Sequence, residues 1–126
     1  MATKRDFGFF TIHLRDDKVI HVAVKAKNEI GIEQIIEIIQ GIALVGESKK
    51  HPIMITVEDH TFPTPEARKY LAQADTNPFA SASAFIVKNL AQKLLVNAYL
   101  KMNRPSRPTR MFTTEESAIQ WLKTFL

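Results

Sequence analysis

The sequence contains no cysteine. This absence excludes disulfide bonds, thiolate zinc sites and cysteine nucleophiles, and it is typical of proteins from the reducing cytoplasm. Long apolar runs are also missing: no stretch approaches the roughly 20 apolar residues of a membrane span, and the N-terminus lacks the apolar segment of a signal peptide. We therefore expect a cytoplasmic protein that inserts no segment into a membrane.

A large excess of charge of one sign is absent too. The formal net charge is +4, and hydrophobic and charged residues make up 45% and 24% of the 126 residues. These values are typical of an ordinary globular protein. A chain of this length suits one domain with one sizeable core. We expect a single domain over residues 1–126.

Period-two alternation on both sides of an Asp-Asp-Lys segment predicts an N-terminal β-hairpin. Residues that pair across a hairpin must share a face of the sheet, so a three-residue loop over 16–18 is the consistent choice. This loop pairs Leu14 with Ile20 and Ile12 with Val22.

Apolar residues at helical spacing alternate with short apolar runs along the rest of the chain. They predict helices at 31–46, 65–73 and 89–102, a last helix after Thr113, and strands at 52–57, 83–87 and 109–112. The order β-β-α-β-α-β-α-β-α predicts an α/β fold with a mixed sheet, an antiparallel N-terminal hairpin and helical cover.

Two helices carry more detailed expectations. In the last helix, Thr113 and Glu116 have the spacing of a capping box. In the third helix, one stripe of small and apolar residues is expected to face the core: Leu90, Ala91, Leu94, Leu95 and Ala98.

Two stretches carry a family resemblance. "MITVEDHTFPTPEA" resembles the strand-turn-helix region of anti-sigma-factor antagonists, and "NAYLKMNRPSRPTRMFTTEESAIQWLKTFL" is similar to small bacterial proteins labelled SpoIIAA-like or STAS/Sec14-like. The chain thus resembles the STAS domain family. The resemblance implies the STAS fold and a regulatory role, since in the antagonists a partner kinase phosphorylates a serine where the second helix begins.

This chain has Thr64-Pro65-Glu66-Ala67 where that motif reads Asp-Ser-Ser-Gly, so the phosphoacceptor motif is absent. One interpretation is purely structural: Thr64 is a natural N-cap, and Pro65 is favoured at the first helical position. The alternatives are that the Glu66 carboxylate replaces the phosphate, or that Thr64 itself is phosphorylated.

The histidines and acidic residues do not predict catalysis or metal binding. Glu58, Asp59 and His60 are adjacent, so their side chains point in different directions at a strand end, and no nucleophile accompanies them. His13 and His21 lie opposite each other in the predicted hairpin, but a catalytic zinc ion requires a third protein ligand. We expect no enzymatic activity, no catalytic residue, no metal and no cofactor.

The segment "KMNRPSRPTR" concentrates positive charge near the C-terminus. Arg104, Arg107 and Arg110 recur every three residues, and such arginines can converge on one anion. The other interpretation is a solvated loop. Nucleic-acid binding would require a broader basic face with stacking aromatic residues, so no nucleic-acid partner is expected.

Two functions remain open. The first is a regulatory interaction domain that binds a protein partner through residues around the start of the second helix: Asp59, Phe62, Thr64 and Glu66. The alternative is a binder of a small anionic or lipid-like ligand in a Sec14-like pocket, with the three arginines at its rim. Partner binding predicts an exposed corner without a deep cavity, whereas ligand binding predicts an apolar pocket. An apolar surplus on the Ile-rich first helix would also favour a homodimer.

Overall fold

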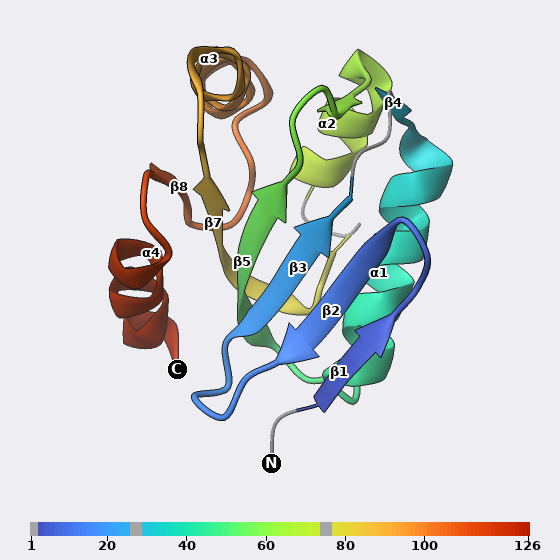
Figure 1. Ribbon diagram of the computed structural model, residues 1–126, viewed down its shortest axis with the longest axis vertical. Coiled ribbons are helices and arrows are strands. Elements are labelled where there is room, and N and C mark those ends of the chain that lie inside the picture. The colour runs from blue at the N-terminus through green and yellow to red at the C-terminus, as the bar shows by residue number, and fades with distance from the viewer. Residues whose placement is uncertain (1–2, 26–28, 74–76) are drawn as a thin grey trace.

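A six-stranded sheet forms the centre of the fold (Figure 1). The computed structural model describes residues 3–25, 29–73 and 77–126. In spatial order the sheet contains β1 (Thr3–Asp6), β2 (Phe10–Leu14), β3 (Ile20–Val24), β5 (His51–Val57), β7 (Ala80–Ile86) and β8 (Thr109–Phe112). Two short strands, β4 (Glu29–Ile30) and β6 (Phe62–Pro63), pair in parallel apart from this sheet.

The described residues also form four α-helices, two of which continue into other helix types. They are α1 (Ile32–Val45), α2 (Pro65–Ala72), α3 (Leu90–Ala98) with a π-helical segment (Tyr99–Asn103), and α4 (Glu115–Leu122) with a 3₁₀ turn (Lys123–Phe125). The predicted class is confirmed: the chain forms an α/β domain with a mixed sheet, antiparallel N-terminal strands and helical cover.

The predicted hairpin register is confirmed. Leu14 pairs with Ile20 and Ile12 with Val22. Lys18 adopts a left-handed conformation with φ 70°, as the last residue of a three-residue hairpin loop does. The sequence did not reveal β1, which pairs antiparallel with β2 at the edge of the sheet. All four residues of β1 are exposed, so no apolar alternation marked this strand.

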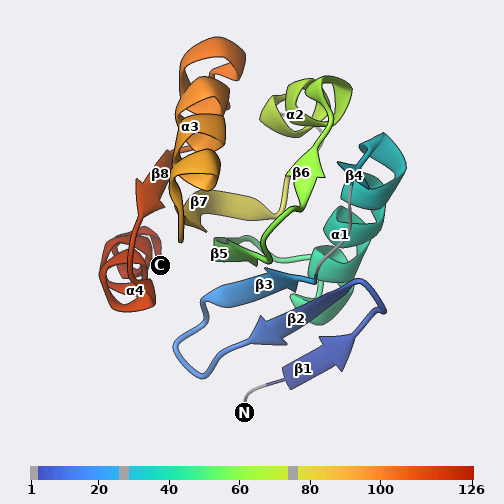
Figure 2. The ribbon, with the colours of Figure 1, turned by 45° about the horizontal axis from the view of Figure 1, so that its top comes forward.

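The four strands from β3 to β8 run parallel, and β5 lies between β3 and β7. A strand in this position is covered on both faces, which explains why Pro52–Val57 reads as a continuous apolar run. Successive side chains point to opposite faces of a sheet. Helices α1, α2 and α3 cover one face of the sheet, and α4 covers the other (Figure 2). Ile55 and Phe85 lie on the first face, whereas Met54 and Ala84 pack against α4.

The predicted inward face of α3 is wrong for Leu90, Ala91 and Leu94 and right for Leu95, which lies beneath the helix on the side of the sheet. Leu90 and Leu94 are 70% and 60% exposed, and the buried residue of the helix is Gln92. The residues that face the sheet instead follow a neighbouring stripe at helical spacing: Gln92, Leu95, Val96 and Tyr99.

Gln92 can occupy a buried position because both ends of its amide are bonded. Its Nε2 donates to the Val57 carbonyl at 3.0 Å, and its Oε1 accepts from the Lys88 backbone N–H at 2.8 Å.

A second correction concerns the start of α4. The N-cap is Thr114 and not Thr113, since the Thr114 hydroxyl accepts from the Ser117 backbone N–H at 3.2 Å.

Candidate ligand-binding pocket

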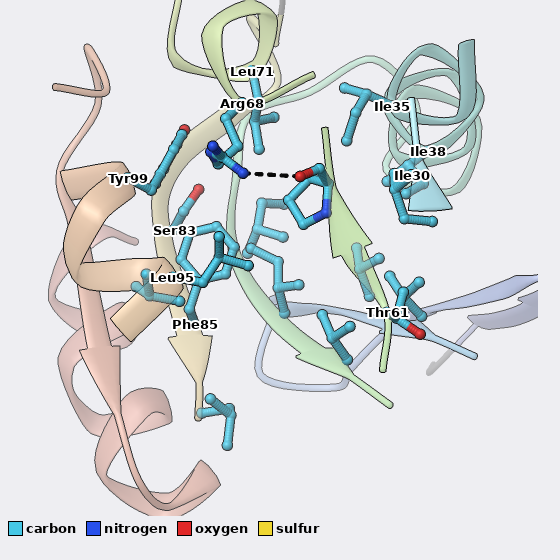
Figure 3. A pocket seen from close by; sticks show the side chains of 18 of the residues that line it. Ile30, Ile35, Ile38, Thr61, Arg68, Leu71, Ser83, Phe85, Leu95 and Tyr99 are labelled. Atoms are coloured by element: carbon cyan, nitrogen blue, oxygen red, sulfur yellow. Dashed lines mark hydrogen bonds between the residues drawn. The ribbon is translucent and has the colours of Figure 1, made fainter. Parts of the chain in front are cut away.

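A pocket of about 140 Å³ lies between the sheet and the three helices that cover this face (Figure 3). Its floor is formed by β3, β5 and β7, with Ile55 and Phe85 among the floor residues. Ile35 and Ile38 of α1 line one side, and Leu95 of α3 lines another. The lining is mostly apolar, so the pocket favours an apolar occupant.

The spacing between α3 and the sheet follows from two aromatic rings. Tyr99, the first residue of the π-helical segment, packs edge-on against Phe85 of β7, with ring centroids 5.8 Å apart and an interplanar angle of 74°. Two large rings that meet edge-on keep the helix away from the strand. Leu95 is consequently only half-buried, and space remains beneath it.

Two arginines supply the charge of the pocket, and the described lining residues include no carboxylate, lysine or histidine. Arg68 on α2 donates from Nη1 to the Pro63 carbonyl at 2.9 Å. Arg107 donates from Nη1 to the Leu71 carbonyl at 3.0 Å and from Nη2 to the Gln73 carbonyl at 3.2 Å. Among the described residues, both guanidinium groups are thus held by backbone oxygens and by no acidic side chain.

Two hydroxyl groups accompany the arginines. In Figure 3 the hydroxyls of Tyr99 and Ser83 point toward the end of the pocket where the Arg68 guanidinium lies. Burial raises the pKa of Tyr99 to about 12, although the neighbouring Arg107 guanidinium opposes this shift. Tyr99 is therefore a neutral phenol at physiological pH and can donate a hydrogen bond.

One buried polar atom in the wall of the pocket has no hydrogen-bond partner among the described residues. Asn77 is 6% exposed and lines the pocket, and its Oδ1 makes no hydrogen bond. Leaving a buried acceptor unpaired costs roughly 1–3 kcal/mol, so native proteins rarely do so without a reason. A water molecule in the pocket, or a donor group of a bound molecule, would satisfy this oxygen.

The four residues predicted to bind a partner lie around the start of α2. Thr64 is the N-cap, and its hydroxyl accepts from the Ala67 backbone N–H at 3.1 Å, while Glu66 is exposed in the first turn. Asp59 is exposed and accepts from the Asn89 side chain at 2.9 Å, and Phe62 is half-buried in β6. The structural interpretation of Thr64 as an N-cap is confirmed.

The three arginines of the C-terminal loop have different surroundings and do not converge. Arg107 lines the pocket. Arg104 is exposed, and its backbone adopts the left-handed conformation, with φ 47°, directly after the π-helical segment. Arg110 lies over the rings of Phe112 and Trp121, at 5.2 and 5.5 Å from their centroids. The cation that joins Arg107 at the pocket is Arg68 of α2.

The histidines lie away from the pocket. His13 and His21 pair across β2 and β3 as predicted, and His21 Nε2 is 2.8 Å from the Thr56 hydroxyl. His51 is buried, and both of its ring nitrogens face carbonyl oxygens, those of Lys18 at 3.1 Å and Gly46 at 3.2 Å. In residues 3–25, 29–73 and 77–126, no three histidine or acidic side chains form a cluster suited to a metal ion.

Sequence reasoning missed Arg68, Tyr99, Ser83 and Asn77. A usable signal existed for Tyr99, since Leu95, Val96 and Tyr99 have the i, i+1, i+4 spacing of one helix face. The polar Gln92 in the same stripe concealed it. Arg68 follows the buried Ala67 on a short helix, and nothing in the sequence separates it from a solvated arginine.

Comparison with known proteins gives one family. The family model described as a domain of unknown function (DUF7793) matches residues 12–126. No curated protein and no solved structure matches the chain. The resemblance to the STAS family is wrong, because no STAS or SpoIIAA-like family model matches. Within the described residues, no helix has the length and apolar composition that crossing a membrane requires.

Proposed function

The chain belongs to the DUF7793 family, and we propose that it is a non-enzymatic domain that binds a small, mostly apolar molecule between α1, α2, α3 and the sheet. The observation that carries this proposal is the pocket of about 140 Å³ itself. An apolar cavity of about 150 Å³ holds one benzene molecule in another protein. The size therefore suits a single ring or a short branched chain.

The composition of the pocket supports binding over catalysis. Its described lining residues contain no acid, histidine or lysine that could act as a general base, and its hydroxyl groups have no such base beside them. Apolar walls with a few polar groups at one end are typical of sites that hold and orient a small molecule.

Methyl NMR of the isotope-labelled protein tests this function, with toluene as the probe. We expect dose-dependent shifts in the Ile35, Ile38, Ile55 and Leu95 methyl groups, because these side chains line the pocket. Leu95→Trp fills the pocket and should abolish the shifts. Leu94→Trp is the matched control: Leu94 is 60% exposed on the same helix. The proposal fails if saturating toluene leaves the pocket methyl groups of the wild-type protein unshifted.

A second candidate function is binding of a regulatory protein at the start of α2, through Asp59, Phe62, Thr64 and Glu66. One observation favours it. The bond between Asp59 and Asn89 places this corner beside the N-terminus of α3, whose Leu90 is 70% exposed. Exposed apolar residues rimmed by polar ones mark many protein interaction sites.

Affinity capture from a native lysate separates the two candidates. A partner that is captured by the wild type and by Leu95→Trp, but lost with Glu66→Lys, would bind the corner. A partner that is retained by Glu66→Lys does not use this corner, and this second proposal would then be abandoned.

A further inference from the structure

We propose that the pocket selects a carboxylate: the ligand is a small apolar carboxylic acid whose carboxylate binds Arg68 and Arg107 while its apolar part fills the cavity. This inference rests on the proposed function, since it names the chemical class of the molecule that the pocket would hold.

The first argument is charge balance. Arg68 and Arg107 are the charged groups among the described lining residues, and both are half-buried. Within the described part of the chain, the salt bridges are Arg15–Asp17 and Lys25–Asp6, so no described acidic residue is paired with either pocket arginine. Removing positive charge from water without an opposite charge is unfavourable. An anionic ligand would supply the missing charge.

The second argument is the number of free donors. A guanidinium carries five N–H donors in a fixed plane. Arg68 uses one of them on the Pro63 carbonyl. Arg107 uses two on the carbonyls of Leu71 and Gln73 and also hydrogen-bonds the Tyr99 hydroxyl. These bonds fix the orientation of each group and leave further N–H groups available. A carboxylate accepts such donors in pairs, which makes it the best-fitting anion for an arginine site.

The third argument concerns the hydroxyl groups at the same end. Tyr99 and Ser83 can each donate to an oxyanion, and both line the pocket beside apolar walls. Hydrogen bonds to a charged acceptor are about twice as strong as neutral ones, and a mostly apolar environment strengthens them further. Arginine and hydroxyl donors together oppose a cationic ligand and favour an anionic one.

Arg107 also has a structural role that the carboxylate site must accommodate. The carbonyls of Leu71 and Gln73 lie at the C-terminal end of α2, where carbonyl oxygens lack partners within the helix, and Arg107 satisfies them. This role accounts for two donors of Arg107. It does not account for Arg68, which bonds a carbonyl before α2 and lines the same pocket.

Three probes that share one ring and one two-carbon chain test the proposal: phenylacetate, 2-phenylethanol and 2-phenylethylamine. Affinities come from methyl NMR titrations at pH 7. We expect phenylacetate to bind at least about tenfold more tightly than the alcohol, a difference of about 1.4 kcal/mol, and the amine to bind weakest. Equal affinities for phenylacetate and the alcohol would overturn the carboxylate proposal.

The variants Arg68→Gln and Arg107→Gln locate the carboxylate. Each should reduce phenylacetate affinity at least about fivefold and leave 2-phenylethanol affinity nearly unchanged. Arg104→Gln is the matched control, because it removes the same charge from an exposed position outside the pocket. Thermal unfolding shows whether Arg107→Gln still folds. If it does not, Arg68→Gln alone decides the question, because this variant loses a single backbone hydrogen bond.

The outcomes separate this inference from the proposed function. If toluene and 2-phenylethanol shift the pocket methyl groups but phenylacetate binds no better, the pocket binds apolar molecules and the carboxylate proposal is wrong. If none of the probes shifts these groups, the binding function itself is wrong. Phenylacetate affinity that falls equally with Arg104→Gln would indicate general attraction to a basic protein, and would overturn the assignment to Arg68 and Arg107.

Discussion

The two faces of the central sheet are packed differently. On the α4 face, Ala82 and Ala84 of β7 are fully buried and contact a helix whose Leu122 is also fully buried. On the opposite face, Phe85 of the same strand meets α3, whose Leu95 is only half-buried, and a pocket of about 140 Å³ remains.

The difference follows from the side chains of a single strand. Small residues on one face allow α4 to approach the sheet closely, and close-packed interiors leave little empty space. A phenylalanine on the other face, supported by Tyr99, keeps α3 away from the strand. Alternation along β7 therefore separates a closely packed face from a face that contains a pocket.

Truncating one leucine on each face should give the largest contrast. Leu122→Ala removes a fully buried side chain and should lower the free energy of unfolding by roughly 2–5 kcal/mol. The Leu95 side chain borders space that is already empty, so we expect Leu95→Ala to lower the free energy of unfolding by only about 1 kcal/mol. Urea unfolding measures both losses in stability, on the condition that the two variants unfold with the same m-value. Equal losses would show that α3 is packed as closely as α4.

Adding volume to adjacent residues of β7 tests the same contrast in reverse. Ala82→Leu forces a larger side chain against α4 and should cost about 1–3 kcal/mol. The side chain at position 83 lines the pocket, so Ser83→Leu should lower the free energy of unfolding by less than about 1 kcal/mol and abolish toluene binding. Thermal unfolding and methyl NMR measure the two effects. A larger loss for Ser83→Leu than for Ala82→Leu would contradict the comparison.

The pocket face is not loose throughout, and Gly41 of α1 sharpens this point. A Cβ at this position would lie 2.8 Å from Cδ1 of Ile12 and 3.1 Å from Cε2 of Phe10. Overpacking lowers the free energy of unfolding by about 1–3 kcal/mol, and the higher helix propensity of alanine raises it by about 1 kcal/mol. Gly41→Ala should therefore destabilise by about 1 kcal/mol. Gln40→Ala, exposed on the same helix, is the control and should change stability by less than about 0.5 kcal/mol.

Much of the fold could be predicted from the sequence because its periodic patterns are strong. The register of Leu14 with Ile20 followed from alternation and loop length, and it is confirmed. Local patterns failed where tertiary contacts decide the outcome. The exposed β1 has no alternation to detect, and Gln92 replaces Leu94 on the inner face of α3 because the Val57 carbonyl binds its amide.

The pocket was harder to predict than the fold. The sequence pointed to Arg107 as an anion-binding residue, but as one of three arginines expected to converge in the C-terminal loop. Of these three, only Arg107 lines the pocket. The other pocket arginine, Arg68, lies 39 residues earlier on α2, whereas Arg107 lies in the loop before β8. Spacing along a chain cannot show that two such residues meet, because that depends on how α2 and the C-terminal loop pack over the sheet.

The smallest effect expected is a dependence of stability on pH that arises on the face away from the pocket. Burial lowers the pKa of His21 below its ordinary value of 6.5, reinforced by His13, Arg15 and Lys4, although Glu115 opposes the shift. A lowered pKa in the folded state means that the unfolded chain binds the proton more readily. The stability contributed by neutral His21 is thus fully present above about pH 7 and is lost as the pH falls below 6.5 and through the lowered pKa of the folded state.

His21→Asn should reduce this slope relative to the wild type, and urea unfolding at pH 7.5 and 5.5 measures the difference. Comparing the two proteins removes the contribution of acidic residues such as Asp17, whose pKa is lowered by Arg15 and the Val19 backbone N–H against the effect of burial. The pocket face should not respond, because Tyr99, with a pKa of about 12, stays neutral over this range. If His21→Asn changes phenylacetate affinity between these pH values, the two faces are coupled and the separation drawn from β7 fails.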